Sequence, residues 1–334
     1  RRILPERKKP AADAALRRTL LGWFSRHARR LPWRSANFPY AVWVSEIMLQ
    51  QTQVATVVPY FNRFITKFPT VEKLASAPLE RVLELWSGLG YYRRARTLHE
   101  AARQMVGRFS GRFPETYEEA RELPGVGDYT ARAVLSIAYN QPYAVLDGNV
   151  ARVIARLRAY RGNLHQTPFR RAVESDLERL LSRRRPGDFN QALMELGQTI
   201  CLPRGPLCTS CPLHSHCRAY RQGEPEAFPE QRPRRASELH YLATAVIHRG
   251  SKVAMVRGLD DGLLGDLWNF PAAFGPSQPL ARKALQKKLE NLFPEVVRLG
   301  KPTGELRHNI THRSIRVDLY PAELAGNGQG NSFR

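Results

Sequence analysis

All four cysteines of the chain lie in one short segment, at Cys201, Cys208, Cys211 and Cys217. Four thiolates this close in sequence can surround one metal centre, whereas a disulfide framework rarely crowds every cysteine of a large chain into a single loop. Zinc ribbons usually use two C-x2-C pairs held apart by a longer loop, and this segment has one such pair. The spacing favours an iron–sulfur cluster, with zinc or free structural thiols as alternatives.

Two carboxylates lie beside apolar residues, in settings that could tune them for opposite roles. Glu46 sits in the apolar helical run 42–49, where burial would raise its pKa and keep it protonated as a general acid. The alternative is a glutamate on a polar helix stripe. Asp147 follows two apolar residues and precedes the helical pattern 150–157, a position typical of an N-cap. A capped aspartate stays ionised and can also face a developing cation.

A glycine-containing turn joins two helical patterns at Leu123-Pro124-Gly125-Val126-Gly127. Glycine permits positive φ and a close approach of another backbone, and the N–H groups that start the next helix can hold a phosphate oxygen. An ordinary helix–helix turn is the alternative. In a basic helical domain, Gly125 and Gly127 indicate an anchor for the DNA backbone that does not depend on base sequence.

The elements that must position these groups are mainly helical up to residue 220. Apolar residues recur at helical spacing in 16–24 and 79–86, and Thr116 with Glu119 predicts a further helix start. Gly and Pro among charges then mark a linker, and the patterns that follow predict a hairpin at 240–257, a helix at 279–292 and a strand at 315–320. The expected parts are a helical catalytic domain, a linker and a small α/β domain, at residues 1–221, 222–238 and 239–334.

The charge balance indicates a polyanionic partner. The chain has 334 residues and a formal net charge of +22, and each Lys or Arg that meets a phosphate releases condensed counterions. No stretch approaches the roughly 20 apolar residues that span a bilayer, and the charged segment 1–9 is not followed by the apolar run of a secretory signal. We expect an intracellular, DNA-associated monomer with no membrane partner, in the cytoplasm or nucleoid if the source is bacterial.

Together these features resemble the MutY family of adenine DNA glycosylases, in the helix-hairpin-helix (HhH) glycosylase superfamily. The matching strings are 31–34, 43–54, 88–92, 123–131, 146–150, 189–192 and the cysteine loop. The resemblance implies a mainly α, two-lobed HhH DNA glycosylase domain with a 4Fe-4S cluster on the four cysteines. It also implies base excision repair, in which adenine is flipped out of double-stranded DNA and cut from an A:8-oxoguanine or A:G mispair.

The resemblance implies a role for each residue that matches a family motif. Glu46 corresponds to the general acid that protonates adenine N7, and Asp147 to the carboxylate that stabilises the sugar cation. Tyr129 and Asn149 correspond to residues that support these two. The adenine pocket corresponds to Trp33, Arg34 and Gln191. The residues that wedge into the duplex or touch the opposite strand correspond to Gln51, Thr52, Leu89 and Tyr91.

Tyr129 also separates this chain from close relatives. In the endonuclease III branch of the superfamily, a lysine at this position attacks the sugar, and strand cleavage follows. A phenol cannot form a Schiff base. We therefore predict a monofunctional glycosylase that leaves an abasic site.

The C-terminal part resembles the 8-oxoguanine-sensing domain of the family, which is related to Nudix hydrolases; the best match is 265–271. A Nudix catalytic helix needs several glutamates to bind Mg²⁺, and segment 281–291 has a single Glu, so we predict no pyrophosphatase activity. Family members carry a Phe-Ser-His hairpin near the 8-oxoguanine. Thr311 and His312 keep the hydroxyl and the imidazole, while Ile310 replaces the aromatic ring. An ordinary surface turn is the alternative.

Two other functions fit parts of the pattern. A non-catalytic iron–sulfur DNA-binding module would bind without releasing a base, but its hallmark would be the loss of a carboxylate, and both are present. An enzyme of the same fold could remove another base, such as thymine from G:T mismatches, or act as a lyase. Tyr129 and the C-terminal domain argue against both.

Overall fold

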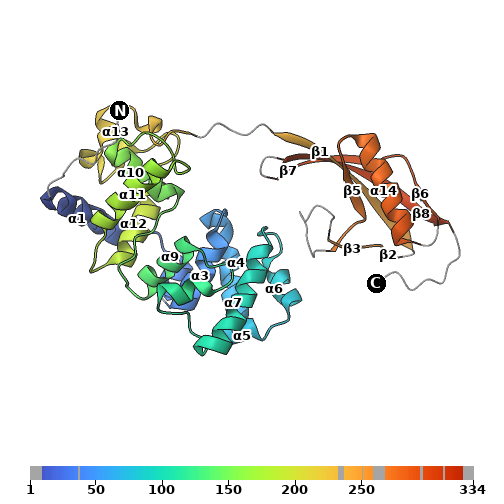
Figure 1. The fold of residues 1–334 in the computed structure, drawn as a ribbon, viewed down its shortest axis with the longest axis horizontal. Helices are drawn as coiled ribbons and strands as arrows, with labels where there is room; N and C mark the ends of the chain where they lie inside the picture. The colour runs from blue at the N-terminus through green and yellow to red at the C-terminus, as the bar shows by residue number, and fades with distance from the viewer. Residues whose placement is uncertain are drawn as a thin grey trace. The chain divides into compact units, whose positions relative to one another are not determined.

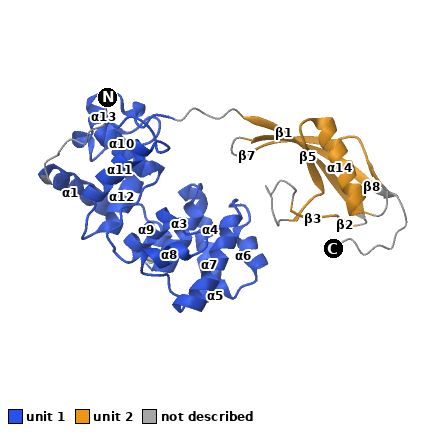
Figure 2. Cartoon of the chain, viewed as in Figure 1, with its two compact units in different colours: residues 1–232 blue, residues 233–334 orange. Residues whose placement is uncertain are grey.

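The computed structural model of the chain describes residues 10–36, 38–231, 237–249, 251–258, 268–293, 296–310 and 313–325. The chain divides into two compact units, residues 1–232 and 233–334 (Figure 2). Unit 1 is helical, and unit 2 contains a sheet and helix α14 (Figure 1). This confirms the predicted mainly α fold with a small α/β region. Among the described residues, no helix is both long and apolar enough to cross a membrane.

Unit 1 has two hydrophobic cores and therefore two lobes, as predicted. The first lobe contains α2 (Pro32–Ala36), α3 (Pro39–Leu49), α4 (Val54–Lys67), α5 (Val71–Ala75), α6 (Leu79–Trp86), α7 (Arg93–Phe109), α8 (Tyr117–Glu122) and α9 (Asp128–Ala138). The second lobe contains α1 (Pro10–His27), α10 (Gly148–Arg158), α11 (Thr167–Leu180), α12 (Pro186–Thr199) and α13 (Arg218–Arg221), with short 3-10 turns η1 (Cys208–Ser210), η2 (His214–His216) and η3 (Pro225–Ala227).

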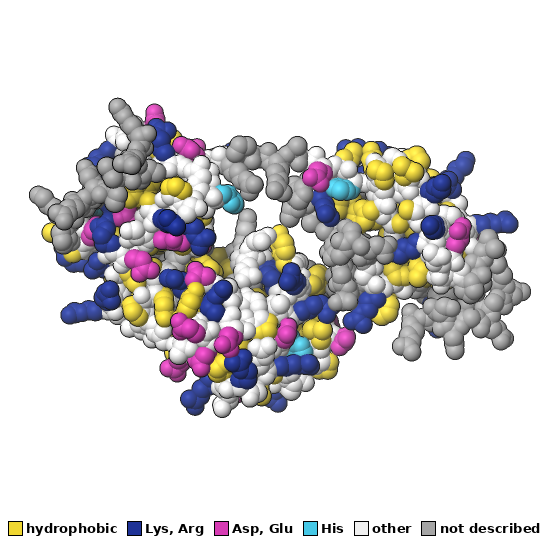
Figure 3. Space-filling model, in the orientation of Figure 1, with side chains coloured by type: hydrophobic (Ala, Val, Ile, Leu, Met, Phe, Trp, Pro, Cys, Tyr) yellow, Lys and Arg dark blue, Asp and Glu magenta, His cyan; other side chains and the backbone are white. Residues whose placement is uncertain are grey.

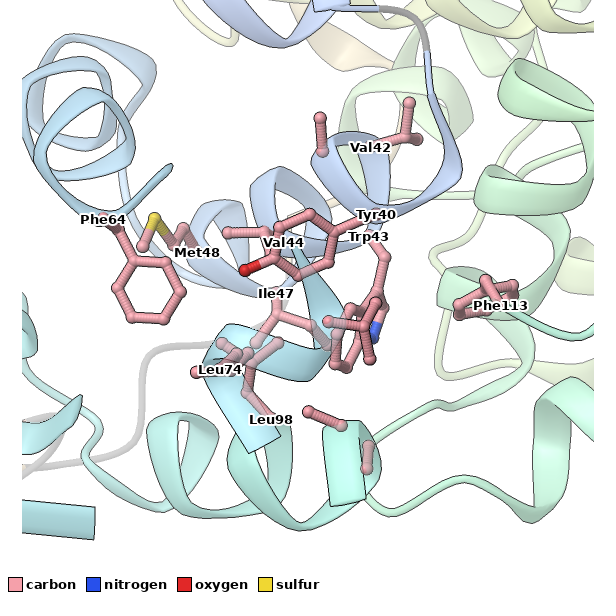
Figure 4. Close-up of a cluster of buried hydrophobic side chains, with 14 of the residues drawn as sticks. Tyr40, Val42, Trp43, Val44, Ile47, Met48, Phe64, Leu74, Leu98 and Phe113 are labelled. Atoms are coloured by element: carbon pink, nitrogen blue, oxygen red, sulfur yellow. The ribbon is translucent and has the colours of Figure 1, made fainter. Parts of the chain in front are cut away.

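Helix α3 forms the centre of the first core. Pro39 begins it, where the fixed φ and missing N–H of proline are well tolerated, and all residues from 40 to 48 are buried. Figure 4 shows apolar side chains of α3 directed at Leu74 of α5 and Leu98 of α7. A polar group in such a helix loses its hydration, so Glu46 is held in an apolar environment.

Helix α12 joins the lobes, because it packs against α1 and α10 of the second lobe and α9 of the first. At Gly187 the two backbones approach so closely that an added Cβ would lie 2.6 Å from the carbonyl oxygen of Ser136 and 2.7 Å from the Cα of Ile137. Space, and not backbone conformation, therefore requires glycine at this position.

Two sequence-predicted helix starts are confirmed. Thr116 caps α8 by accepting a hydrogen bond from the N–H of Glu119 at 3.3 Å. Asp147 caps α10 by accepting one from the N–H of Val150 at 2.6 Å. Each cap satisfies an otherwise unpaired N–H group and is worth about 1 kcal/mol.

Unit 2 has a mixed sheet built around the parallel strands β1 and β8. β1 also pairs antiparallel with β2 and β5, β8 pairs antiparallel with β6 and β7, and β3 pairs with β4. The strands are β1 (Glu238–Arg249), β2 (Lys252–Val253), β3 (Val256–Arg257), β4 (Trp268–Asn269), β5 (Ala272–Gly275), β6 (Val296–Leu299), β7 (Gly304–Ile310) and β8 (Arg313–Ala325). The predicted hairpin is confirmed where β2 pairs with β1, whereas β3 pairs with β4 in a separate two-stranded sheet.

Helix α14 (Gln278–Leu292) packs against this sheet, as predicted from its helical pattern. Its buried Ala281, Leu285 and Leu289 are four residues apart, so they form one stripe that contacts the sheet core.

The segment after α13 packs onto the second lobe of unit 1. Phe228 is buried in the second core, and its carbonyl oxygen accepts a hydrogen bond from Arg156 at 2.9 Å. The first part of the predicted linker 222–238 is therefore ordered against the helical lobe, because it carries an aromatic side chain that the lobe can bury.

Candidate active site

Glu46 lies on α3 with only 6% of its surface exposed, so it is not on a solvated polar stripe. Burial raises its pKa to about 7. A hydrogen bond with Tyr129 lowers the pKa, the negative charge of Asp147 raises it, and the positive charge of Arg34 lowers it. Glu46 can therefore carry a proton near neutral pH, where an ordinary glutamate is ionised.

Tyr129, near the start of α9, connects the two carboxylates. Burial raises the pKa of Tyr129 well above its ordinary value, and the negative charges of Glu46 and Asp147 raise it further. The phenol stays protonated and forms a hydrogen bond with Glu46, and its oxygen lies 3.4 Å from the Sδ of Met194 on α12. Residues from α3, α9 and the start of α10 are thus near enough to influence one another electrostatically.

Asp147 has a polar environment. Its carboxylate accepts hydrogen bonds from the backbone N–H of Val150 at 2.6 Å and from the side-chain amide of Asn149 at 2.9 Å. The amide oxygen of Asn149 in turn accepts from Arg152 at 2.9 Å, which also donates to the carbonyl oxygen of Cys201 at 2.8 Å. These bonds fix the carboxylate at the positive end of the α10 dipole.

Asn190 of α12 holds the segment that leads to Asp147, and the sequence analysis did not assign it a role. The buried side chain accepts from the N–H of Val145 at 3.2 Å and donates to the carbonyl oxygen of Tyr143 at 2.8 Å and the hydroxyl of Ser136 at 2.9 Å. An asparagine inside a helix is intrinsically unfavourable, and that was the available signal.

Two of the three expected pocket residues contact each other directly. Arg34 of α2 donates to the side-chain oxygen of Gln191 on α12 at 3.0 Å. Trp33, which precedes Arg34 in the chain, is buried and packs edge-on against Phe61, with ring centroids 5.3 Å apart.

Glu195, one helical turn after Gln191, orients Arg34 and was missed by the sequence analysis. Its carboxylate is 1% exposed and accepts from Arg34 at 3.0 Å and from Arg29 at 2.6 Å. Burial alone would raise the pKa of Glu195, but the hydrogen bond from Arg29 and the charge of Arg34 outweigh it and lower the pKa. The four-residue spacing from Gln191, which puts both on one helix face, could have indicated it.

The residues expected to contact the duplex lie in two loops, loop 50–53 between α3 and α4 and loop 87–92 between α6 and α7. Gln51 and Thr52 belong to the first, and Leu89 and Tyr91 to the second. Both loops are hydrogen-bonded to Arg94 of α7. The sequence analysis did not find this residue, because one arginine among the arginines of 93–96 gives no distinguishing signal.

The glycine turn stands immediately before α9. Gly125 has φ +77°, and an added Cβ would lie 2.5 Å from the Oγ1 of Thr97. Gly127 is the N-cap of α9 and brings no side chain to the first N–H groups of that helix. Because both glycines are exposed, these donors can face an external anion.

The four cysteines lie in the loop after α12 and carry no disulfide. Burial raises the pKa of Cys211 to about 12; a backbone hydrogen bond from Leu213 lowers it, and the charges of the other three thiols raise it. The four thiols are therefore near enough to interact. Arg156 donates to the Sγ of Cys201 at 3.4 Å. Within the described ranges, no group of three or more His, Cys, Asp or Glu side chains is arranged to hold a metal ion.

Thr311 and His312 lie outside the described residues, as do the first three residues of the Nudix-like string 265–271.

On the face of unit 1 that Figure 3 draws, Lys and Arg side chains lie between scattered acidic side chains. The excess of 52 basic over 30 acidic residues is thus partly displayed on the helical unit.

Comparisons with known proteins agree with this geometry. Residues 44–183 match the HhH-GPD superfamily of base excision DNA repair proteins. The chain is 39% identical to adenine DNA glycosylase of Mus musculus, over 93% of this chain and 71% of that protein, and 38% identical to adenine DNA glycosylase of Homo sapiens, over 95% and 68%. The solved structure of a thermostable thymine-DNA glycosylase superposes with a TM-score of 0.56 at 28% identity, over 64% of this chain and 98% of that one. The chain therefore belongs to the adenine DNA glycosylase family of base excision repair enzymes.

Proposed function

We propose that the protein is a monofunctional adenine DNA glycosylase that hydrolyses the N-glycosidic bond of adenine mispaired with 8-oxoguanine or guanine in double-stranded DNA. One observation carries the proposal: Glu46, buried among apolar side chains, lies in one electrostatic environment with Asp147, which is held by N–H donors. Cleavage of this bond needs a proton for the base and a negative charge beside the sugar.

Glu46 supplies the proton. Its pKa of about 7 keeps a useful fraction protonated at neutral pH while leaving the acid strong enough to donate. Tyr129 holds the carboxyl by a hydrogen bond and, being uncharged, adds no competing anion. Arg34, which Glu195 holds, and Gln191, which accepts from Arg34, provide polar groups that can recognise the edge of a flipped adenine.

Asp147 supplies the negative charge. Its two hydrogen bonds from Val150 and Asn149 fix the carboxylate before the substrate arrives, so no reorganisation is needed as the sugar becomes cationic. Tyr129 occupies the position of the lyase lysine of relatives, and its buried neutral phenol cannot attack the sugar as an amine would. The product is therefore an abasic site in an uncut strand.

The four cysteines are assigned to a 4Fe-4S cluster. The spacing C-x6-C-x2-C-x5-C supports this assignment, because it has a single C-x2-C pair and short loops, whereas zinc ribbons usually use two such pairs held apart by a longer loop. The cluster would supply structural support to a loop that Arg152 and Arg156 already tie to α10. Iron and sulfide analysis with a visible absorption spectrum tests this; a colourless, zinc-loaded and fully active protein would exclude it.

Unit 2 is proposed to be Nudix-like and to sense the 8-oxoguanine strand through Thr311 and His312. Its mixed sheet with a packed helix supports a small α/β recognition domain. The catalytic domain, the linker and this domain would occupy 1–221, 222–238 and 239–334, and the protein would act on DNA as a monomer.

The decisive experiment is a single-turnover excision panel on duplexes that contain A:8-oxoguanine, A:G, A:T, G:T or an oxidised pyrimidine. We expect adenine release from the first two and an uncut strand until alkali is added. Release of thymine from G:T, or strand cleavage without alkali, would refute the substrate or the monofunctional assignment. Binding to all duplexes without base release would leave only a DNA-binding module.

A further inference from the structure

Loop 50–53 and loop 87–92 each hold a non-glycine residue in the left-handed backbone region. Gln51 has φ +55° and Tyr91 has φ +50°. Such conformations cost free energy and persist where surrounding contacts enforce them. Both side chains are exposed, with 49% of Tyr91 accessible. The backbone of each loop therefore needs contacts that hold it in this conformation.

A single guanidinium makes those contacts. Arg94, only 9% exposed, donates from Nη1 to the carbonyl oxygens of Ile47 at 3.1 Å and Met48 at 2.8 Å. The same nitrogen donates to the carbonyl oxygen of Gln50, and Nη2 donates to the hydroxyl of Thr52 at 3.2 Å. The end of α3 and the whole turn that follows it are thus bound to one side chain.

The second terminal nitrogen also reaches the other loop. Nη2 of Arg94 donates to the carbonyl oxygen of Gly90 at 3.3 Å and to that of Leu89 at 3.5 Å. The ring of Tyr91 lies over the guanidinium, with 5.1 Å from Cζ to the ring centroid. Burial lowers the pKa of Arg94 to about 10, so the group stays charged at neutral pH and its hydrogen bonds are charge-assisted.

We propose that Arg94 is a positioning residue that joins the two loops into one preformed surface, so that Gln51 and Tyr91 enter the duplex together when a mispair is opened. This inference rests on the proposed function. A lysine cannot replace Arg94, because an ammonium is a compact point charge and lacks the planar fork that reaches both loops at once. Preorganisation of this kind removes the ordering cost from the binding step.

The test compares Arg94→Lys with Arg103→Lys. Arg103 lies on the same helix and donates to the carbonyl oxygen of Ala75, away from both loops. Hydrogen exchange of loops 50–53 and 87–92 is measured without DNA. Affinity is measured for duplexes with A:8-oxoguanine or A:T, each with a 2′-fluoro adenosine that resists excision.

We expect Arg94→Lys to speed exchange in both loops and to reduce the preference for the mispair over A:T by about tenfold, with Arg103→Lys unchanged. If Arg94 had a purely structural role, Arg94→Lys would weaken the binding of both duplexes equally. Unchanged exchange in both loops overturns the proposal whatever the enzyme's substrate. If Arg94→Lys speeds exchange in both loops but the wild-type protein never releases adenine, the proposed function is refuted and the proposal on Arg94 stands.

Thr52→Val supplies the same test with the guanidinium of Arg94 intact, should Arg94→Lys not fold. It removes one acceptor from Arg94 in loop 50–53. If the guanidinium couples the loops, the N–H of Leu89, bonded to the carbonyl oxygen of Trp86 at 3.0 Å, exchanges faster although nothing near it has changed. Faster exchange confined to loop 50–53 contradicts the coupling.

Discussion

Glu46 and Asp147 carry the same functional group in opposite surroundings. Glu46 lies in a helix buried on all sides, with the phenol of Tyr129 as its hydrogen-bond partner. Asp147 starts a helix and accepts from a backbone N–H and a side-chain amide. Burial favours the neutral acid and N–H donors suit the anion. The difference shows how one fold can suit one carboxyl group to proton donation and another to the stabilisation of positive charge.

The strongest way to break this comparison is Asp147→Asn. Asparagine still caps α10 through its side-chain oxygen, but the charge beside the sugar is lost. We expect the single-turnover excision rate to fall by about 10³-fold or more, with mispair affinity and the unfolding temperature little changed. An unchanged excision rate would remove Asp147 from the electrostatic role.

Glu46→Gln tests the other side. The amide keeps the shape of the side chain and cannot donate a proton from oxygen. We therefore expect the excision rate to fall by about a hundredfold or more. Binding to the mispaired duplex should be retained. Turnover close to that of the wild type would show that the proton comes from elsewhere.

The pH profile sharpens the comparison. Excision needs the protonated form of Glu46, so the single-turnover rate should fall as the pH rises through about 7. The hydrogen bond with Tyr129 lowers this pKa, so its removal in Tyr129→Phe should raise the pKa and move the falling limb to higher pH. A limb that moves to lower pH, or does not move, contradicts this account.

The smallest expected effect is on stability. The pKa of Glu46 is raised from 4.5 to about 7 in the folded state. Above the folded pKa, the buried carboxylate therefore destabilises the folded state by the full amount, because the unfolded state ionises the same group at lower pH. Glu46→Gln does not titrate and should be more stable than the wild type by about 1 to 3 kcal/mol near pH 8, with the gain disappearing as the pH falls towards 4.5.

Glu195→Gln is the matched control for that stability measurement. The pKa of Glu195 is lowered by Arg29 and Arg34 in the folded state, so its ionised form contributes stability at neutral pH that is lost on acidification. The variant should be less stable than the wild type near pH 8. Denaturant unfolding at several pH values checks both signs, and equal changes in the two variants would refute the contrast.

Sequence patterns predicted what depends on neighbours along the chain. The cap at Asp147, the burial of Glu46 and the helix α14 each follow from residues within one or two turns. Arg94, Asn190 and Glu195 were not predicted, because their partners come from distant segments. The acceptors of Arg94 include carbonyl oxygens more than forty positions away, and a carbonyl leaves no mark in an amino-acid sequence.

The linker shows the same limit from the other direction. Gly, Pro and charge predict a flexible connection at 222–238, yet Phe228 is buried and Glu230 is bonded to Gly162. Amino-acid composition describes the average character of the segment. The burial of one aromatic residue in the second core nevertheless decides where the first part of the segment lies.

The contact at Gly187 has a consequence for how a nucleobase enters. There the main chains of α9 and α12 touch with no side chain between them, so the lobes cannot approach more closely and cannot close on a substrate at that point. A larger residue at position 187 would push α9 and α12 apart, and with them Tyr129 and Met194, which these two helices bring into contact.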